Sequence, residues 1–111
     1  YNYSIMTPNQ TLHKNPSLCI PKVDKGIREK DIREVFKKLN FGLVERIDIV
    51  SWKTNTNTTK FSRVFIHFKG WNDSAENIRD ALLNGDVYNI VHNFPWYWKV
   101  VASRLPKPTH N

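Results

Sequence analysis

Hydrophobic and polar residues alternate along residues 60–71, which read KFSRVFIHFKGW. Val64, Ile66 and Phe68 fall at every second position, so they share one face of a strand. The opposite face carries Phe61, Arg63, Phe65 and His67. The pattern therefore predicts a strand with one apolar face for a core, and a second face with two aromatic rings, a guanidinium and an imidazole.

Two segments have apolar residues at the spacing of a helix. The first starts at Glu29, and its apolar stripe consists of Ile32, Val35, Phe36 and Leu39. Asn40 or Gly42 can end this helix with a positive φ. The second has a stripe of Ala75, Ile78 and Leu82 and ends at Asn84-Gly85. Asp73 and Glu76 predict a capping box at its start.

The remaining apolar runs predict four more strands. They are residues 17–23 (SLCIPKV), 44–50 (VERIDIV), 87–93 (VYNIVHN) and 96–103 (WYWKVVAS). Pro21 predicts that the first of these strands ends or bulges there. Phe94-Pro95 separates the last two, which predicts a hairpin. Residues 51–60 predict a polar loop.

The elements follow the order β-α-β-β-α-β, with one extra strand before the last. We expect an α+β domain in residues 17–104, between an N-terminal arm of residues 1–16 and a C-terminal tail of residues 105–111. Two helices cannot cover both faces of a four-stranded antiparallel sheet, so we expect both on its apolar face. The face that carries Arg63 and Phe65 then stays open.

The distribution of charge points to a polyanionic partner. The 111 residues have a formal net charge of +7. Residues 1–23 and 87–111 contain five bases and no acid, whereas residues 24–86 contain twelve bases and ten acids. We therefore expect the two basic ends to supply much of the attraction to a nucleic acid.

Other features limit the compartment and the chemistry. Cys19 is the single cysteine, which excludes an intrachain disulfide and a zinc site built on cysteines, and suits an intracellular protein. No apolar run is long enough to span a membrane, so we expect no membrane partner. The four glycines are dispersed, and we find no nucleophile–base arrangement and no metal-ligand spacing. We therefore expect that this chain is not an enzyme and that it binds no cofactor, metal or small-molecule substrate. The chain starts at Tyr1 rather than methionine, so we expect further residues before it.

The predicted third strand and the order of the elements resemble the RNA-recognition motif (RRM), a ferredoxin-like β-α-β-β-α-β sandwich. Its octamer signature is Arg/Lys-Gly-Phe/Tyr-Gly/Ala-Phe/Tyr-Ile/Leu/Val-x-Phe/Tyr, and Phe65-Ile66-His67-Phe68 match the last four positions. The resemblance implies that Phe65 stacks on a base and that Phe68 lies in the core. The first four positions depart from the signature, with Phe61, Ser62, Arg63 and Val64 in their places.

The family's hexamer signature, Ile/Leu/Val-Phe/Tyr-Ile/Leu/Val-x-Asn-Leu/Ile, falls on residues 18–23. Cys19 replaces its stacking aromatic and Lys22 its asparagine, so Phe65 is the one family platform aromatic that this chain keeps. The runs SLCIPKV, RVFIHF, LLNGD and PWYWKV also resemble RRM-like small proteins of nucleocytoplasmic large DNA viruses. That resemblance implies a viral origin, with the chain in the host cytoplasm or nucleus or in the virion, and implies no activity.

We predict a nucleic-acid-binding surface on the open face. Bases stack on rings and guanidinium planes while lysines and arginines hold phosphates. The candidate residues are Phe65, Arg63, His67, Phe61, Lys22, Lys53, Lys60, Lys99 and Arg104. We expect single-stranded RNA, or another single-stranded nucleic acid, as the partner. The alternative is a protein partner or a structural role in a virion, because two family aromatics are absent and an apolar sheet face suits a protein.

The sequence leaves the orientation of several side chains open. In the run Trp96-Tyr97-Trp98, either both tryptophans face the helices or Tyr97 does. A tryptophan on the open face would replace the missing aromatics. His67 can contact a ligand or be a solvated surface residue. The side chains that we expect to pack are Trp52, Trp71 and Cys19.

Overall fold

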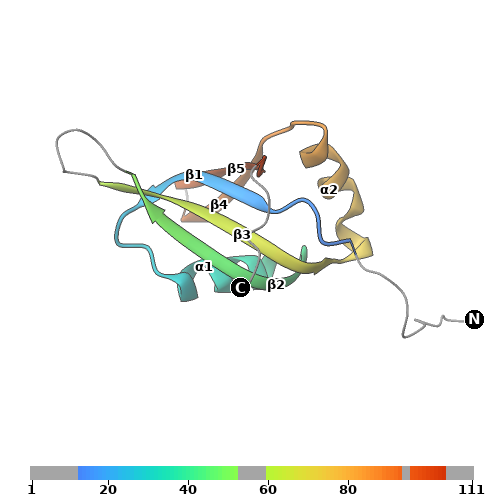
Figure 1. The fold of residues 1–111 in the computed structure, drawn as a ribbon, viewed down its shortest axis with the longest axis horizontal. Coiled ribbons are helices and arrows are strands. Elements are labelled where there is room, and N and C mark those ends of the chain that lie inside the picture. Colours follow the sequence, from blue (N-terminus) through green and yellow to red (C-terminus); the bar gives the residue numbers. More distant parts are fainter. Residues whose placement is uncertain (1–12, 53–59, 94–95, 105–111) are drawn as a thin grey trace, which may run out of the picture.

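The computed structural model describes residues 13–52, 60–93 and 96–104 (Figure 1). Those residues form five strands and two helices. The strands are β1 (Leu18–Asp24), β2 (Gly42–Ser51), β3 (Phe61–Trp71), β4 (Tyr88–Asn93) and β5 (Trp96–Ala102). The helices are α1 (Glu29–Leu39) and α2 (Glu76–Leu83), and a short 3-10 turn, η1 (Asp73–Ala75), precedes α2.

Within the described residues, the five strands form one sheet in the order β2-β3-β1-β5-β4, and each pair of neighbours is antiparallel. The predicted α+β class with an antiparallel sheet is confirmed. The predicted four-stranded sheet is wrong, because β4 pairs along β5 and extends the sheet by one edge strand. In Figure 1, α1 lies behind β2 and β3.

The helix α1 matches its predicted pattern. Ile32 and Phe36 are buried one turn apart, and Arg33 and Glu29 form an ion pair at 2.8 Å on the outer surface. The helix ends at Asn40, whose φ of 56° lies in the left-handed region. Asn40 is one of the two residues predicted to end the helix with a positive φ. The Asn40 backbone N–H donates to the carbonyl oxygen of Phe36, which satisfies one carbonyl of the last turn.

The start of α2 differs from the prediction. Asp73 begins a 3-10 turn, and Ala75 occupies the N-cap of α2 without a side-chain hydrogen bond. The predicted capping box of Asp73 and Glu76 is therefore wrong. The side-chain amide of Asn72 instead donates to the carbonyl oxygen of Asn40 at 3.0 Å, so the segment before α2 is tied to the end of α1.

One buried cluster joins the sheet to both helices. Val64, Ile66 and Phe68 are fully buried, which confirms the face predicted from their alternation. The helix residues packed in the same cluster are Ile32, Phe36 and Leu82, with Val35 and Ile78 partly buried. The centroid of the Phe68 ring lies 6.4 Å from that of Phe36 and 4.6 Å from that of Trp71. The other face of β3 stays outside this core.

The last residues of the predicted N-terminal arm contact the domain. Trp71 donates its backbone N–H to the carbonyl oxygen of His13 at 2.7 Å and its indole N–H to that of Pro16 at 3.0 Å. Arg79 of α2 donates to the carbonyl oxygen of Asn15 at 2.6 Å. Contacts with the domain therefore begin before residue 17.

Candidate functional site

Strand pairing places several side chains in one row on the open face of the sheet. Cys19 of β1 lies opposite both Phe65 of β3 and Val101 of β5, and Phe65 also lies opposite Asp48 of β2. The register between β1 and β3 shifts around Pro21, which confirms the predicted bulge. Four strands therefore contribute to a surface centred on Phe65.

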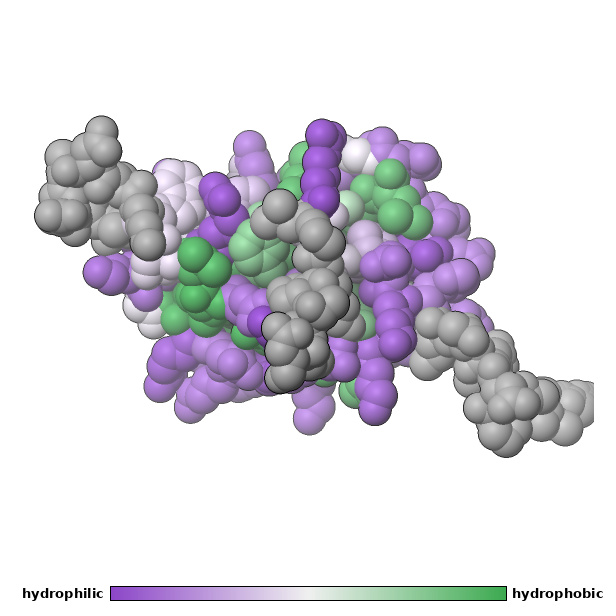
Figure 2. Space-filling model, in the orientation of Figure 1, coloured by the Kyte–Doolittle hydropathy of each residue, from purple (hydrophilic) through white to green (hydrophobic). Residues whose placement is uncertain are grey.

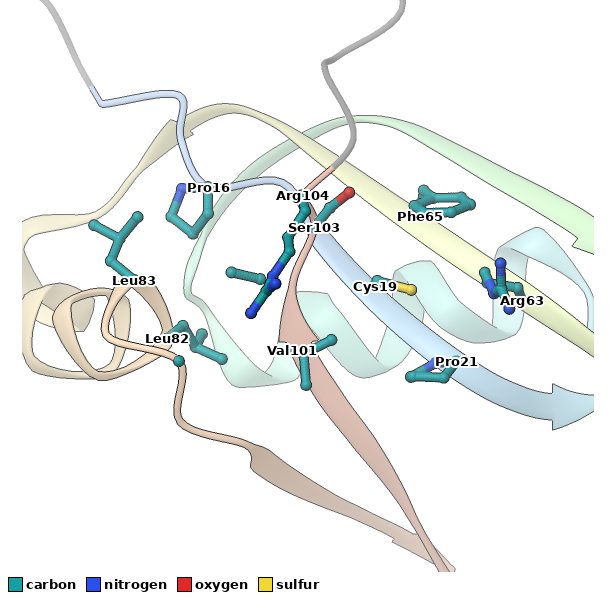
Figure 3. Close-up of a pocket in the computed structure, with 12 residues that line it drawn as sticks. Pro16, Cys19, Pro21, Arg63, Phe65, Leu82, Leu83, Val101, Ser103 and Arg104 are labelled. Atoms are coloured by element: carbon teal, nitrogen blue, oxygen red, sulfur yellow. The ribbon is translucent and has the colours of Figure 1, made fainter.

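A groove of about 670 Å³ crosses this surface (Figure 3). Its wall includes Phe65 and Arg63 of β3, Cys19 and Pro21 of β1, Val101 of β5, the following Arg104, and Leu83 of α2. Phe65 is half-buried, whereas Arg63 is exposed. An accessible ring next to an accessible cation can hold a planar group and an anion at the same time.

Trp52 lies at the edge of this groove, next to Arg63. Its indole N–H donates to the carbonyl oxygen of Pro21 at 2.9 Å, so the ring reaches past the end of β3 toward β1. The Arg63 guanidinium carbon and the Phe61 ring centroid each lie 5.9 Å from the Trp52 ring centroid. The Lys22 ammonium covers the Phe61 ring at 4.1 Å. Trp52 thus packs, as predicted, but it packs against candidate binding residues.

The structure decides which side chains of β5 face the helices, a choice that the sequence left open. Trp98 is 6% exposed and Val100 is fully buried, so both face the helices. Tyr97 is 49% exposed and, with the exposed Lys99, faces the other side. Trp96, at the start of the strand, is also exposed. The aromatic ring that β5 adds to the open face is therefore a tyrosine.

His67 is not available on this face, which contradicts its predicted role as a contact or solvated residue. The side chain is 3% exposed. Its Nδ1 lies 2.7 Å from the Ser17 hydroxyl, and its Nε2 lies 3.2 Å from a carboxylate oxygen of Asp48. Because both ring nitrogens have partners on neighbouring segments, the imidazole can be buried without an unsatisfied polar atom.

Ser17, His67 and Asp48 are the residue types of a hydrolase triad, but their placement suits a structural role. Ser17 is 6% exposed and is not among the residues that line the groove, whereas a nucleophile needs access to its substrate. Arg46 donates to Asp48 at 2.8 Å. Burial raises the pKa of Asp48, but the hydrogen bond and charge of Arg46, with a smaller effect of His67, hold the pKa below its usual value. We interpret this network as a link between the start of β1, β3 and β2.

Cys19 forms the apolar floor of the groove next to Phe65. It is 9% exposed, which confirms the predicted burial. Burial raises the pKa of its thiol, and the charge of Arg63 only partly opposes that effect. A thiol that stays protonated is a poor nucleophile, so Cys19 offers the groove a small apolar surface rather than a reactive group.

The remaining candidate bases occupy different places. Lys99 and Arg104 are exposed on the groove or on an adjoining hollow. Lys60 is exposed just before β3, and Lys53 lies outside the described residues. Figure 2 views the molecule from the side opposite α1, where hydrophilic residues surround and interrupt hydrophobic patches. Among the residues that line the groove and the adjoining hollows, rings and cations are interleaved.

The structure offers no support for a metal site or a membrane span in the residues that it describes. No group of three or more His, Cys, Asp or Glu residues among them could hold a metal ion. None of the helices that they form is long and apolar enough to cross a membrane.

Comparison with known proteins adds no further information. No protein-family model, curated protein or solved structure matches this chain. The assignment of a function therefore depends on the geometry and chemistry of the open face.

Proposed function

We propose that this chain is a non-catalytic module that binds single-stranded RNA, or another single-stranded nucleic acid, on the open face of its sheet. The observation that carries the proposal is the half-buried ring of Phe65 beside the exposed guanidinium of Arg63, in a groove on the face opposite the core. Bases stack on aromatic rings, at about 1–3 kcal/mol per base, and on guanidinium planes.

The charge of the surface supports an anionic partner. Lys22, Lys99 and Arg104 are exposed around the groove, in a chain of net charge +7. Asp48, which lies in the same row as Phe65, is already engaged by Arg46. The cations that flank the groove can therefore attract phosphates with little opposition from this carboxylate.

The arrangement of the sheet supports an RRM-like, ferredoxin-like sandwich as the scaffold. A β-α-β-β-α-β chain with right-handed crossovers gives the order β2-β3-β1-β5 with both helices packed into one core. In this proposal β4 is an additional hairpin strand. The viral origin suggested by the resemblance of several runs, including PWYWKV, is a separate hypothesis.

A protein partner is the second candidate, and exposed apolar side chains on the β4–β5 hairpin favour it. Val91 is 60% exposed and Trp96 is 68% exposed. An edge strand with exposed apolar residues suits association with another polypeptide. Such a partner would not require Phe65 or Arg63, so substitutions at these two positions distinguish the candidates.

Fluorescence anisotropy with fluorescein-labelled octauridylate tests the proposal. Phe65→Ala should raise Kd about 5- to 150-fold, which corresponds to the loss of one stacked base. Arg63→Ala should weaken binding and reduce the dependence of Kd on salt. Lys37→Ala, which removes an exposed charge from α1, is the matched control and should leave Kd within about twofold of the parent. A parent chain that binds neither this RNA nor octathymidylate, or a folded Phe65→Ala variant that binds as tightly as the parent, would refute the proposal.

A further inference from the structure

Two smaller hollows adjoin the central groove on the open face. One, of about 270 Å³, is lined by Val50, Ser51, Trp52 and Arg63. The other, of about 310 Å³, is lined by Pro21, Lys22, Tyr97 and Lys99. Arg63 and Pro21 also line the central groove, so each is a wall shared by two hollows. The three hollows are therefore contiguous and extend from β2 to β5.

Each outer hollow repeats the combination of ring and cation found in the centre. Trp52 lies beside Arg63, and Tyr97 lies beside Lys22 and Lys99. The hydrogen bond from Trp52 to the Pro21 carbonyl oxygen orients the indole before a ligand arrives, which lowers the entropy lost on binding. A ring for the base and a cation for the phosphate are what each nucleotide of a single strand requires.

We infer that the three hollows bind three consecutive nucleotides of one single strand, with one base in each hollow. The inference deepens the proposed function and rests on it. Phe65 holds the central base, and Trp52 and Tyr97 hold the bases on either side. Trp52 and Tyr97 then supply the two aromatic platforms that Cys19 and Arg63 do not provide.

The walls between the hollows require the bound strand to be unstacked. Arg63 stands between the Trp52 hollow and the central groove, and Pro21 stands between the central groove and the Tyr97 hollow. The bases must separate onto different rings, which a single strand allows and a duplex does not. Lys22 and Lys99 lie where they can hold the phosphate that precedes or follows the base on Tyr97.

Anisotropy with fluorescein-labelled oligouridylates of two to six nucleotides tests this inference. Affinity should rise steeply from two to three nucleotides and only gradually beyond three. Trp52→Ala and Tyr97→Ala should each raise the Kd for hexauridylate about fivefold or more. Tyr97→Phe keeps the ring and should stay within about twofold of the parent.

Trp96→Ala is the matched control, because this exposed aromatic precedes Tyr97 on the same strand and its side chain alternates to the other face. It should bind hexauridylate as the parent does. If a folded Tyr97→Ala or Trp52→Ala variant binds like the parent while Phe65→Ala binds weakly, the three-nucleotide site is refuted and the proposed function stands. If the parent binds neither an oligouridylate nor octathymidylate, both are refuted. Should Trp52→Ala fail to fold by circular dichroism, Tyr97→Ala alone decides.

Discussion

Truncation of two phenylalanines on opposite faces of β3 separates the core from the binding surface. Phe68→Ala removes a fully buried ring that lies 4.6 Å from the ring of Trp71. Such a truncation costs about 3–5 kcal/mol, because apolar burial is lost and the cavity closes only in part. Domains of this size are stable by about 5–15 kcal/mol in total, so the variant should lose a large share of its stability.

Phe65→Ala should be much less destabilising. Its ring is half-buried in the wall of an open groove, so water can fill the space that the ring leaves. We expect a loss of about 1 kcal/mol, in the range of partly exposed apolar side chains. The same substitution should weaken RNA binding, whereas Phe68→Leu, which keeps an apolar side chain in the core, should not.

Urea unfolding followed by circular dichroism measures both free energies. The comparison is valid if the variants and the parent share one m-value, which shows that the same surface is exposed on unfolding. If Phe65→Ala proves more destabilising than Phe68→Ala, the two faces of β3 are assigned the wrong way round. Phe65 and Arg63 would then face inward, and the proposal of a binding surface would lose its main support.

Two further predictions concern stability. Gly42→Ala should lower the free energy of unfolding by about 1–3 kcal/mol, because a Cβ there would collide with the carbonyl oxygen of Gly70. Gly26→Ala has free space and should change the free energy of unfolding by less than about 1 kcal/mol. Urea midpoints of the two variants measure the difference, and equal midpoints would contradict the close approach of Gly42 to Gly70. The pKa of Asp48 in the folded chain lies below its usual value of 3.8, so its contribution to stability is fully present above about pH 4 and is lost as the pH falls through the lower folded pKa. Unfolding from pH 6 to pH 2 should show the gap between the parent and Asp48→Asn narrowing below about pH 4, and a constant gap would contradict the role of Arg46.

The local patterns in the sequence were sufficient for the elements that a period defines. Alternation in β3 placed Val64, Ile66 and Phe68 together, and the structure buries all three. The apolar stripe of α1 and its end at Asn40 or Gly42 were also predicted, because helix periodicity and a left-handed terminal residue depend on neighbours in the chain; the structure selects Asn40. The same alternation left two choices for Tyr97, facing the helices or facing the open side. The packing of Trp98 into the core places Tyr97 on the open side.

The sequence could not show which side chains on the open face are accessible. His67 shares a strand face with Phe65, yet it is buried because Ser17, which lies 50 positions away in the sequence, and Asp48 meet its two ring nitrogens. Trp52 joins the binding surface through a hydrogen bond to Pro21, a residue 31 positions away. Alternation determines which side of a strand a residue faces, because it is a property of one backbone segment. Exposure on that side depends on what the adjacent strands place against the residue, and that depends on strand register, which only the tertiary structure decides.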